Sequence, residues 1–176
     1  MKKPNDLTID YGALSNGEHD FDYEVNKEFF EAFENNMFAD ASATVWVTIQ
    51  KDGKQGQLQI TMNGAIRTLC DRCGDDIVLE FETDNQLLIS TTLSNETAED
   101  VDRPEVIILD VKQQIAIGQL IYEYICLTVP MQIIHADDDE GNSTCNAETL
   151  KKLENLQPKD QTTDSRWDDL KNIKLN

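Results

Sequence analysis

The chain has 176 residues, of which 34 are acidic and 15 are basic, so its formal net charge is −19. A protein with this charge repels phosphate backbones, which argues against unaided binding to nucleic acid. The charge favours a basic protein partner, or it serves only to keep the protein soluble. No apolar run approaches the ~18 residues that a membrane-spanning helix needs, and the N-terminal segment lacks the apolar stretch of a secretory signal. With four cysteines in such a chain, we expect a reduced, cytoplasmic protein with no membrane partner.

The N-terminal half predicts strands interrupted by one helix. Residues 7–14 indicate a short strand, and residues 18–25 alternate apolar side chains with acids, which is the period of a strand. A helix is expected over residues 27–38, capped by Asn26. Residues 42–70 then alternate on both sides of an Asp-Gly pair, which predicts a β-hairpin.

The second half predicts one more long strand followed by helices. Residues 76–90 continue the alternating pattern, and the run at 105–110 is a short buried strand. Asp110 with Gln113 resembles a capping box, and the apolar residues that follow have helical spacing up to Pro130. A further short helix carries Leu150 and Leu153.

Strands followed by helices are typical of an α+β fold with an antiparallel β-sheet or a partly closed barrel, packed with helices. We expect a single domain over residues 1–156, with acidic loops near 94–105 and 136–146. Residues 157–176 are expected to form a linker and a C-terminal docking segment, in which Trp167 packs on the domain because an exposed indole would leave apolar area in water.

A Cys-x-x-Cys pair, Cys70 and Cys73, falls between two predicted strands. Two thiolates at this spacing reach one ion, as in zinc knuckles, but zinc needs two further ligands. His135 and Cys145 flank one loop and complete a Cys₃His set, although their spacing exceeds that of usual zinc motifs. Cys126 lies in a helical apolar pattern and is expected to be a small core residue.

Two other interpretations of the cysteine pair stay open. The pair could be a plain strand-linking turn, with His135 a surface histidine. It could also be a thiol redox centre, but the following Asp75 and Asp76 would raise a thiol pKa, and no helix N-terminus is predicted there to lower it. The chain shows no GxSxG, P-loop or GxGxxG motif, so no enzyme is expected.

Three segments in order carry a resemblance: "LCDRCGDDI", "YEYICLTVPMQIIHADDDEGNSTC" and "TTDSRWDDLKNI". Together they resemble the YceD family, the large ribosomal RNA subunit accumulation proteins, over most of residues 40–172. Cys70, Arg72 and Cys73 match its first motif, and Leu127, Val129 and Pro130 match its second. Asp164, Arg166 and Trp167 match the last motif, with Ser165 where the family has proline.

The resemblance implies a non-enzymatic bacterial factor that supports the accumulation or processing of large-subunit ribosomal RNA. An acidic protein can bind a basic ribosomal protein by charge complementarity, so the expected partner is a ribosomal protein or the pre-ribosomal large subunit, with ribosomal RNA contacted indirectly. Candidate partner-binding residues are Arg67, Arg72, Arg166 and Trp167, although each arginine could instead pair with neighbouring acids. The alternatives are a zinc-stabilised interaction domain unrelated to ribosomes and a thiol oxidoreductase.

Overall fold

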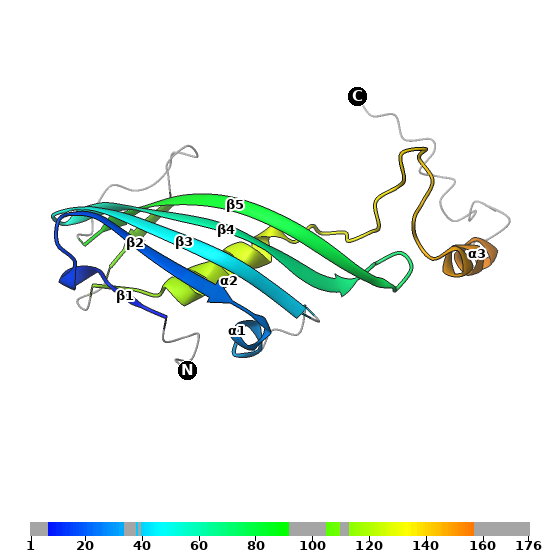
Figure 1. Cartoon of the computed structure of the whole chain (residues 1–176), viewed down its shortest axis with the longest axis horizontal. Helices are drawn as coiled ribbons and strands as arrows, with labels where there is room; N and C mark the ends of the chain where they lie inside the picture. The colour runs from blue at the N-terminus through cyan, green and yellow to red at the C-terminus, as the bar shows by residue number, and fades with distance from the viewer. Residues whose placement is uncertain (1–6, 34–37, 39, 92–104, 110–112, 157–176) are drawn as a thin grey trace, which may run out of the picture. The chain divides into compact units, whose positions relative to one another are not determined.

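The structure is a computed structural model that describes residues 7–33, 38, 40–91, 105–109 and 113–156. The chain divides into two compact units, Met1–Ile134 and His135–Asn176. Among the described residues, the first unit contains the β-strands, and the second contains a loop and helix α3 (Ala147–Leu156) (Figure 1). Residues 157–176, with the expected docking segment and Trp167, lie outside the described residues, so the predicted boundary at 156 stays a prediction.

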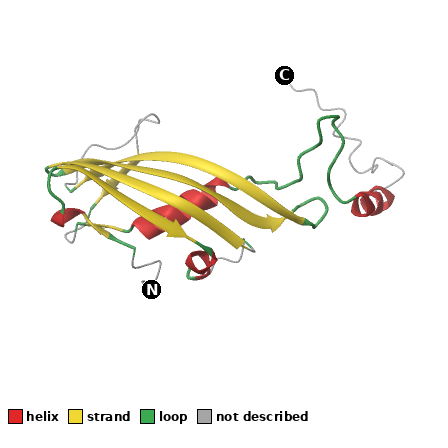
Figure 2. Cartoon of the chain, viewed as in Figure 1, coloured by secondary structure: helices red, strands yellow, loops and turns green. Residues whose placement is uncertain are grey.

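The described part of the first unit contains seven strands, a 3₁₀ turn and two helices. In chain order these are β1 (Ile9–Asp10), η2 (Tyr11–Ala13), β2 (Gly17–Val25), α1 (Lys27–Glu31), β3 (Asp40–Asp52), β4 (Gln55–Leu69), β5 (Asp76–Ser90), β6 (Glu105–Ile108), β7 (Gln114–Ile115) and α2 (Ile117–Thr128). The second unit contains α3 (Ala147–Leu156). Strands dominate the described chain, as Figure 2 shows, and none of its helices is long and apolar enough to cross a membrane.

Five strands form one sheet in the order β2-β3-β4-β5-β6, and β1 pairs with β7 in a separate two-stranded sheet. Strands β2 to β5 are antiparallel neighbours, as expected, whereas β6 runs parallel to β5. The sheet ends at β2 and β6 without closing, so the sheet prediction is confirmed and the barrel alternative is wrong. The hairpin between β3 and β4 turns at the predicted Asp52-Gly53 pair, where Gly53 has a left-handed φ of 59°.

The core lies on one face of the five-stranded sheet, called here the inner face. Period-two alternation places every second side chain of β3 and β4 there, and these residues are fully buried: Val45, Val47, Ile49, Leu58, Ile60 and Met62. Helix α2 lies against this face (Figure 1) and adds Ile117, Ile121 and Ile125 at a spacing of four residues. The opposite, outer face of the sheet has no helix of the described chain on it.

Three local predictions differ from the structure. Of the strand expected over 7–14, only Ile9–Asp10 is extended, because the Asp10 carboxylate accepts a bond from Ala13 N and caps a 3₁₀ turn. Helix α1 ends at Glu31, and the Asn26 side chain makes no capping bond. Gln113 has a φ of 50° and leads into β7, so it is not part of a capping box.

One buried cation ties the N-terminal segment to the sheet. Lys51 on β3 is 9% exposed, and its ammonium donates to the carbonyl oxygens of Tyr11 (2.8 Å) and Leu14 (2.7 Å). The Tyr11 hydroxyl in turn donates to Gln55 O at 2.6 Å. These bonds satisfy a buried charge that has no carboxylate partner in the described chain, and they hold η2 beside the β3–β4 hairpin.

Candidate metal centre

The predicted turn between strands is present where β4 ends at Leu69 and β5 begins at Asp76. Cys70 N donates to Asp75 O and Gly74 N donates to Cys70 O, both at 2.8 Å. Gly74 has a φ of 79°, which a residue with a Cβ rarely adopts, so glycine is required to close the turn. Both thiols of this knuckle are buried, with exposures of 2% for Cys70 and 8% for Cys73.

The chain after α2 is anchored beside this knuckle. Asp71 N donates to Ile133 O, and Ile133 N donates to the Asp71 Oδ2 carboxylate oxygen, both at 2.7 Å. His135 follows Ile133 by two residues, and two residues span at most about 7 Å. Asp71 therefore sets how far the imidazole can lie from the knuckle.

A compact loop brings Cys145 back to His135, which explains their long separation in sequence. The Asp138 carboxylate accepts bonds from Glu140 N (3.0 Å) and from Asn142 N (2.7 Å), and Gly141 turns the chain with a φ of 82°. The hydrogen bond from the Asn142 amide, more than any other contact, lowers the pKa of Asp138. Asp138 belongs to the acidic run at residues 137–140, so this run supplies the carboxylate that closes the loop.

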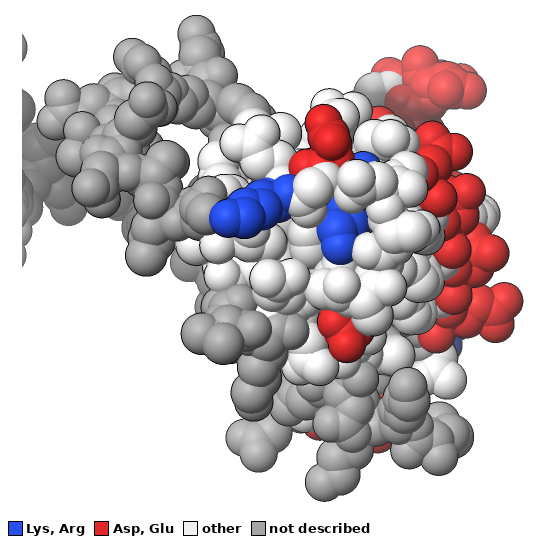
Figure 3. Space-filling model, turned by 90° about the vertical axis from the view of Figure 1, so that its left-hand side faces the viewer, with Lys and Arg blue, Asp and Glu red and all other residues white. Residues whose placement is uncertain are grey.

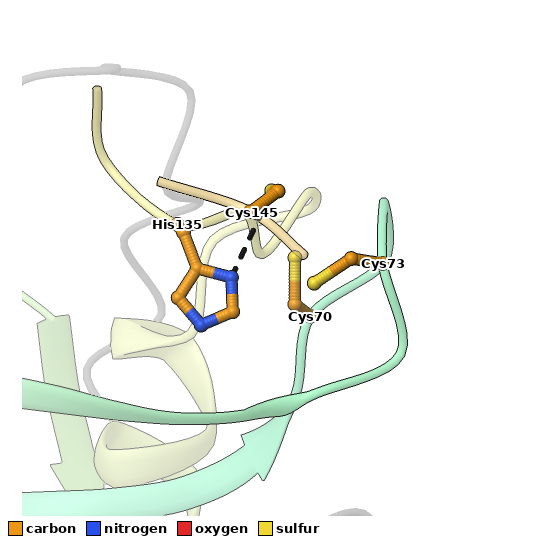
Figure 4. A group of neighbouring side chains, drawn as sticks. All are labelled: Cys70, Cys73, His135 and Cys145. Carbon is orange, nitrogen blue, oxygen red and sulfur yellow. Dashed lines mark hydrogen bonds between the residues drawn. The ribbon is translucent and has the colours of Figure 1, made fainter. Parts of the chain in front are cut away.

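The four predicted ligands form one cluster. Cys145 is 5% exposed, and its Sγ lies 3.7 Å from His135 Nδ1. One ligand atom from each of Cys70, Cys73, His135 and Cys145 lies within 4.8 Å of the others. Figure 4 shows the four side chains grouped together. None of the four cysteines, all of which lie in the described chain, forms a disulfide.

Three thiols and one imidazole are a donor set that zinc takes in closed, four-coordinate structural sites. Tetrahedral ligation with Zn–S bonds of about 2.3 Å separates the sulfurs by about 3.8 Å, so the cluster needs to contract by only about 1 Å. A cluster of these residues could therefore bind a metal ion.

The other cysteine and histidine of the sequence lie elsewhere. Cys126 is on α2 and half-buried, so it packs at the edge of the core and not in its centre. His19 is on β2, where its ring nitrogen lies 2.8 Å from Ser15 O.

The predicted partner-binding residues are not brought together in the described chain. Arg67 is an exposed residue of β4, opposite Asp40 and Val78, and Arg72 is half-buried inside the knuckle. Arg166 and Trp167 lie outside the described residues.

Sequence reasoning missed the outer face of the sheet as a candidate surface. Trp46 on β3 is 41% exposed at its centre, in a cross-strand row with Asp22, Thr61 and Asp84. Ten exposed carboxylates share this face: Glu18, Asp20, Asp22 and Glu24 on β2, Asp40 and Asp52 on β3, and Asp76, Glu80, Glu82 and Asp84 on β5. Figure 3 shows acidic side chains gathered along one side of the described surface. In the sequence, the alternation of acids with apolar residues along 18–25 and 76–90 could have identified this surface.

Comparison with protein-family models identifies a family for this chain. The family model described as large ribosomal RNA subunit accumulation protein YceD matches residues 58–174. No curated protein and no solved structure matches the chain. The matched region contains all four clustered ligands and strand β5.

Proposed function

We propose, on the basis that the chain belongs to the YceD family of large ribosomal RNA subunit accumulation proteins, that it is a non-enzymatic assembly factor. In this role it supports the accumulation or processing of large-subunit ribosomal RNA in the cytoplasm. Its direct partner is a basic ribosomal protein, alone or in the pre-ribosomal large subunit, and it reaches the RNA through that partner.

The acidic outer face is the observation that supports a basic protein partner. Exposed carboxylates of β2 and β5 flank Trp46 there, and no helix of the described chain covers them. Such a surface repels phosphate but attracts lysine and arginine side chains, and this attraction accelerates encounter with a basic protein. An aromatic side chain at the centre of a polar surface is typical of an energetically important contact.

Co-sedimentation with precursor large subunits tests this function. We expect the purified chain to sediment with them at low salt and to be released as salt is raised, because acid–base contacts are screened. Asp22→Asn/Asp84→Asn and Trp46→Ala should each weaken association by about tenfold. Glu148→Gln/Glu154→Gln on α3 removes the same charge and should change it little. No association of the unaltered chain at low salt would contradict the function.

The metal site is proposed to be structural. Zinc held by Cys70, Cys73, His135 and Cys145 would join the knuckle to the loop, and all four positions of its coordination shell would be filled by protein. A closed shell leaves no position for a substrate or water, which favours a stabilising role over a catalytic one.

Elemental analysis of protein purified without chelator tests the metal. We expect one zinc per chain, lost in Cys73→Ser and retained in Cys126→Ser, which removes a thiol outside the cluster. A folded protein with no metal would mean that the knuckle is only a turn.

A zinc-stabilised interaction domain with a partner outside the ribosome is the second candidate, and the same cluster supports it. It predicts bound zinc without ribosomal co-sedimentation. If the chain were a thiol oxidoreductase, Cys70 or Cys73 should be alkylated rapidly at neutral pH. Both thiols are buried, which argues against such reactivity.

A further inference from the structure

Strand β5 has one edge that is mostly open. The strand pairs with β4 along its whole length, Asp76 to Ser90, but β6 pairs only with Leu87–Ser90. In the described part of the chain, no strand pairs with the other side of residues 77–86. An antiparallel or parallel strand could be added there, since an edge presents unpaired backbone donors and acceptors.

A hollow lies directly beside this edge. It has a volume of about 550 Å³, and its walls come from β5 residues 80–83, Asn85 and the C-terminal end of α2. Tyr124, Leu127 and Thr128 supply the helix wall, and the Leu127 side chain is 78% exposed. An added strand directs alternate side chains to one face, so every second side chain of such a strand would enter this hollow.

The rim of the edge is acidic. Strand β5 carries Asp76, Glu80, Glu82 and Asp84 and has no lysine or arginine. Glu80, Glu82 and Asp84 project on the outer face, whereas Phe81, Thr83 and Asn85 point to the inner face. Glu80 and Glu82 also line the hollow. The one arginine nearby in the sheet register is Arg67, which is paired with Val78 at the far end of the open stretch.

From these three features we infer that the β5 edge between Ile77 and Gln86 binds an extended, basic segment of a protein partner as an added strand. Lysine or arginine side chains of that segment would face the outer carboxylates, and its alternate apolar side chains would enter the hollow beside Leu127. Backbone pairing supplies affinity in this mode, and the alternating side chains supply specificity. The inference rests on the proposed function, in which the partner is a basic ribosomal protein.

A synthetic ten-residue peptide of alternating lysine and valine is a suitable probe. Its binding to the full chain is measured by fluorescence anisotropy at physiological salt, where unspecific charge attraction is screened. Amide exchange followed by NMR reports whether residues 77–86 become protected. We expect binding, together with slower exchange of alternate amides in this stretch.

Two further peptides separate strand addition from charge attraction. One is N-methylated at the backbone of every lysine and the other at the backbone of every valine. Each peptide therefore loses the backbone N–H donors along one of its own edges, while its charge is unchanged. In strand addition only one edge of the peptide faces β5, so one of the two should bind about tenfold more weakly than the other. Equal affinity of all three peptides, or no protection of residues 77–86, would overturn the inference.

Matched charge variants locate the surface. Glu80→Gln/Glu82→Gln on β5 should weaken binding of the probe by about fivefold, whereas Glu148→Gln/Glu154→Gln on α3 removes equal charge and should change binding by less than about twofold. Equal effects of the two pairs would count against the β5 edge. A dimer of the chain that the peptide dissociates would place a second copy on the edge and would also overturn the inference.

Failure of the edge inference can be distinguished from failure of the proposed function. If the unaltered chain sediments with precursor large subunits but the three peptides bind equally, the function stands and the β5 edge is not its docking surface. If the chain does not sediment with them, the function fails whatever the peptides show, and the edge inference fails with it because the inference takes a basic ribosomal partner as its premise.

Discussion

Two carboxylates shape the backbone around the candidate metal centre without being ligands. Asp71 accepts a hydrogen bond from Ile133 N, which lies 62 residues further along the chain, and Asp138 closes the loop between His135 and Cys145. Residues that orient the ligands of a metal commonly affect its affinity almost as much as the ligands do. Both carboxylates are therefore direct targets for mutation.

Replacing Asp71 should weaken metal binding. Asp71→Ala removes the carboxylate that holds Ile133, so the approach of His135 becomes less restricted and zinc affinity should fall by about tenfold. Competition with a chromophoric chelator measures the change. Asp84→Ala removes a carboxylate on the outer face of β5 and serves as the control. Unchanged affinity in Asp71→Ala would show that this pairing does not position the imidazole.

The loop around Asp138 should open in acid. The Asn142 amide bond and further bonds lower the pKa of Asp138, so the folded loop favours the carboxylate form. Its contribution is present above the ordinary carboxyl pKa of about 3.9 and is lost as the pH falls through the lower pKa of the folded state. NMR titration of the Asn142 amide should show a midpoint below 3.9. That transition should vanish in Asp138→Asn and persist in Asp139→Asn.

At the scale of elements, strands β3 and β4 approach each other closely at Gly64. A Cβ on this residue would lie 2.2 Å from Ser42 O and 2.8 Å from the Cα of Ala43. Backbone atoms cannot move aside as a flexible side chain can, so only glycine fits in this register. The hairpin, with 13 paired positions between Asp40 and Asp52, depends on that close contact.

Gly64→Ala should therefore destabilise the fold by about 3 kcal/mol, the upper part of the usual range for overpacking. Urea unfolding followed by tryptophan fluorescence measures the free energy of unfolding. Gly53→Asn is the matched control: Gly53 has a positive φ but open space around it, and asparagine tolerates that conformation. We expect the control to lie within about 0.5 kcal/mol of the unaltered chain. Equal stability of both variants would mean that β3 and β4 can separate at no cost.

At the scale of the whole molecule, charge is the dominant property. A net charge of −19 repels itself more strongly when the chain is compact than when it is unfolded. The acids alternate with apolar residues on β2 and β5, so burial of the inner face forces the carboxylates together on the outer face. The same arrangement that would attract a basic partner thus reduces the stability of the unbound chain.

Salt should accordingly stabilise the unbound protein. Raising sodium chloride from about 0.01 M to about 0.15 M shortens the Debye length from ~30 Å to ~8 Å. A gain of about 1 kcal/mol would raise Tm by roughly 3 °C for a chain of this size. Differential scanning calorimetry measures this shift, and Asp20→Asn/Asp22→Asn/Glu24→Gln should reduce it. A Tm that falls with salt would indicate that ion pairs outweigh repulsion.

Some features followed from residue order alone because they depend on neighbours in the chain. Alternation along 42–70 and 76–90 predicted the long strands, Asp52-Gly53 predicted their turn, and Pro130 predicted where α2 ends. The Cys-x-x-Cys turn between strands was likewise predicted correctly, since both thiols and the closing Gly74 lie within five residues.

Other features were decided only by tertiary structure, because they depend on residues far apart in sequence. Pairing of β1 with β7 turned the expected capping box at Gln113 into the approach to a strand. The four ligands converge because bonds between Asp71 and Ile133 and a loop closed by Asp138 bring distant backbone together, and no spacing rule contains those contacts. In the described part of the chain, the edge of β5 is open because β6 pairs only with its last four residues. Local patterns select elements, whereas the distribution of neighbours around each element determines which of its surfaces stay exposed.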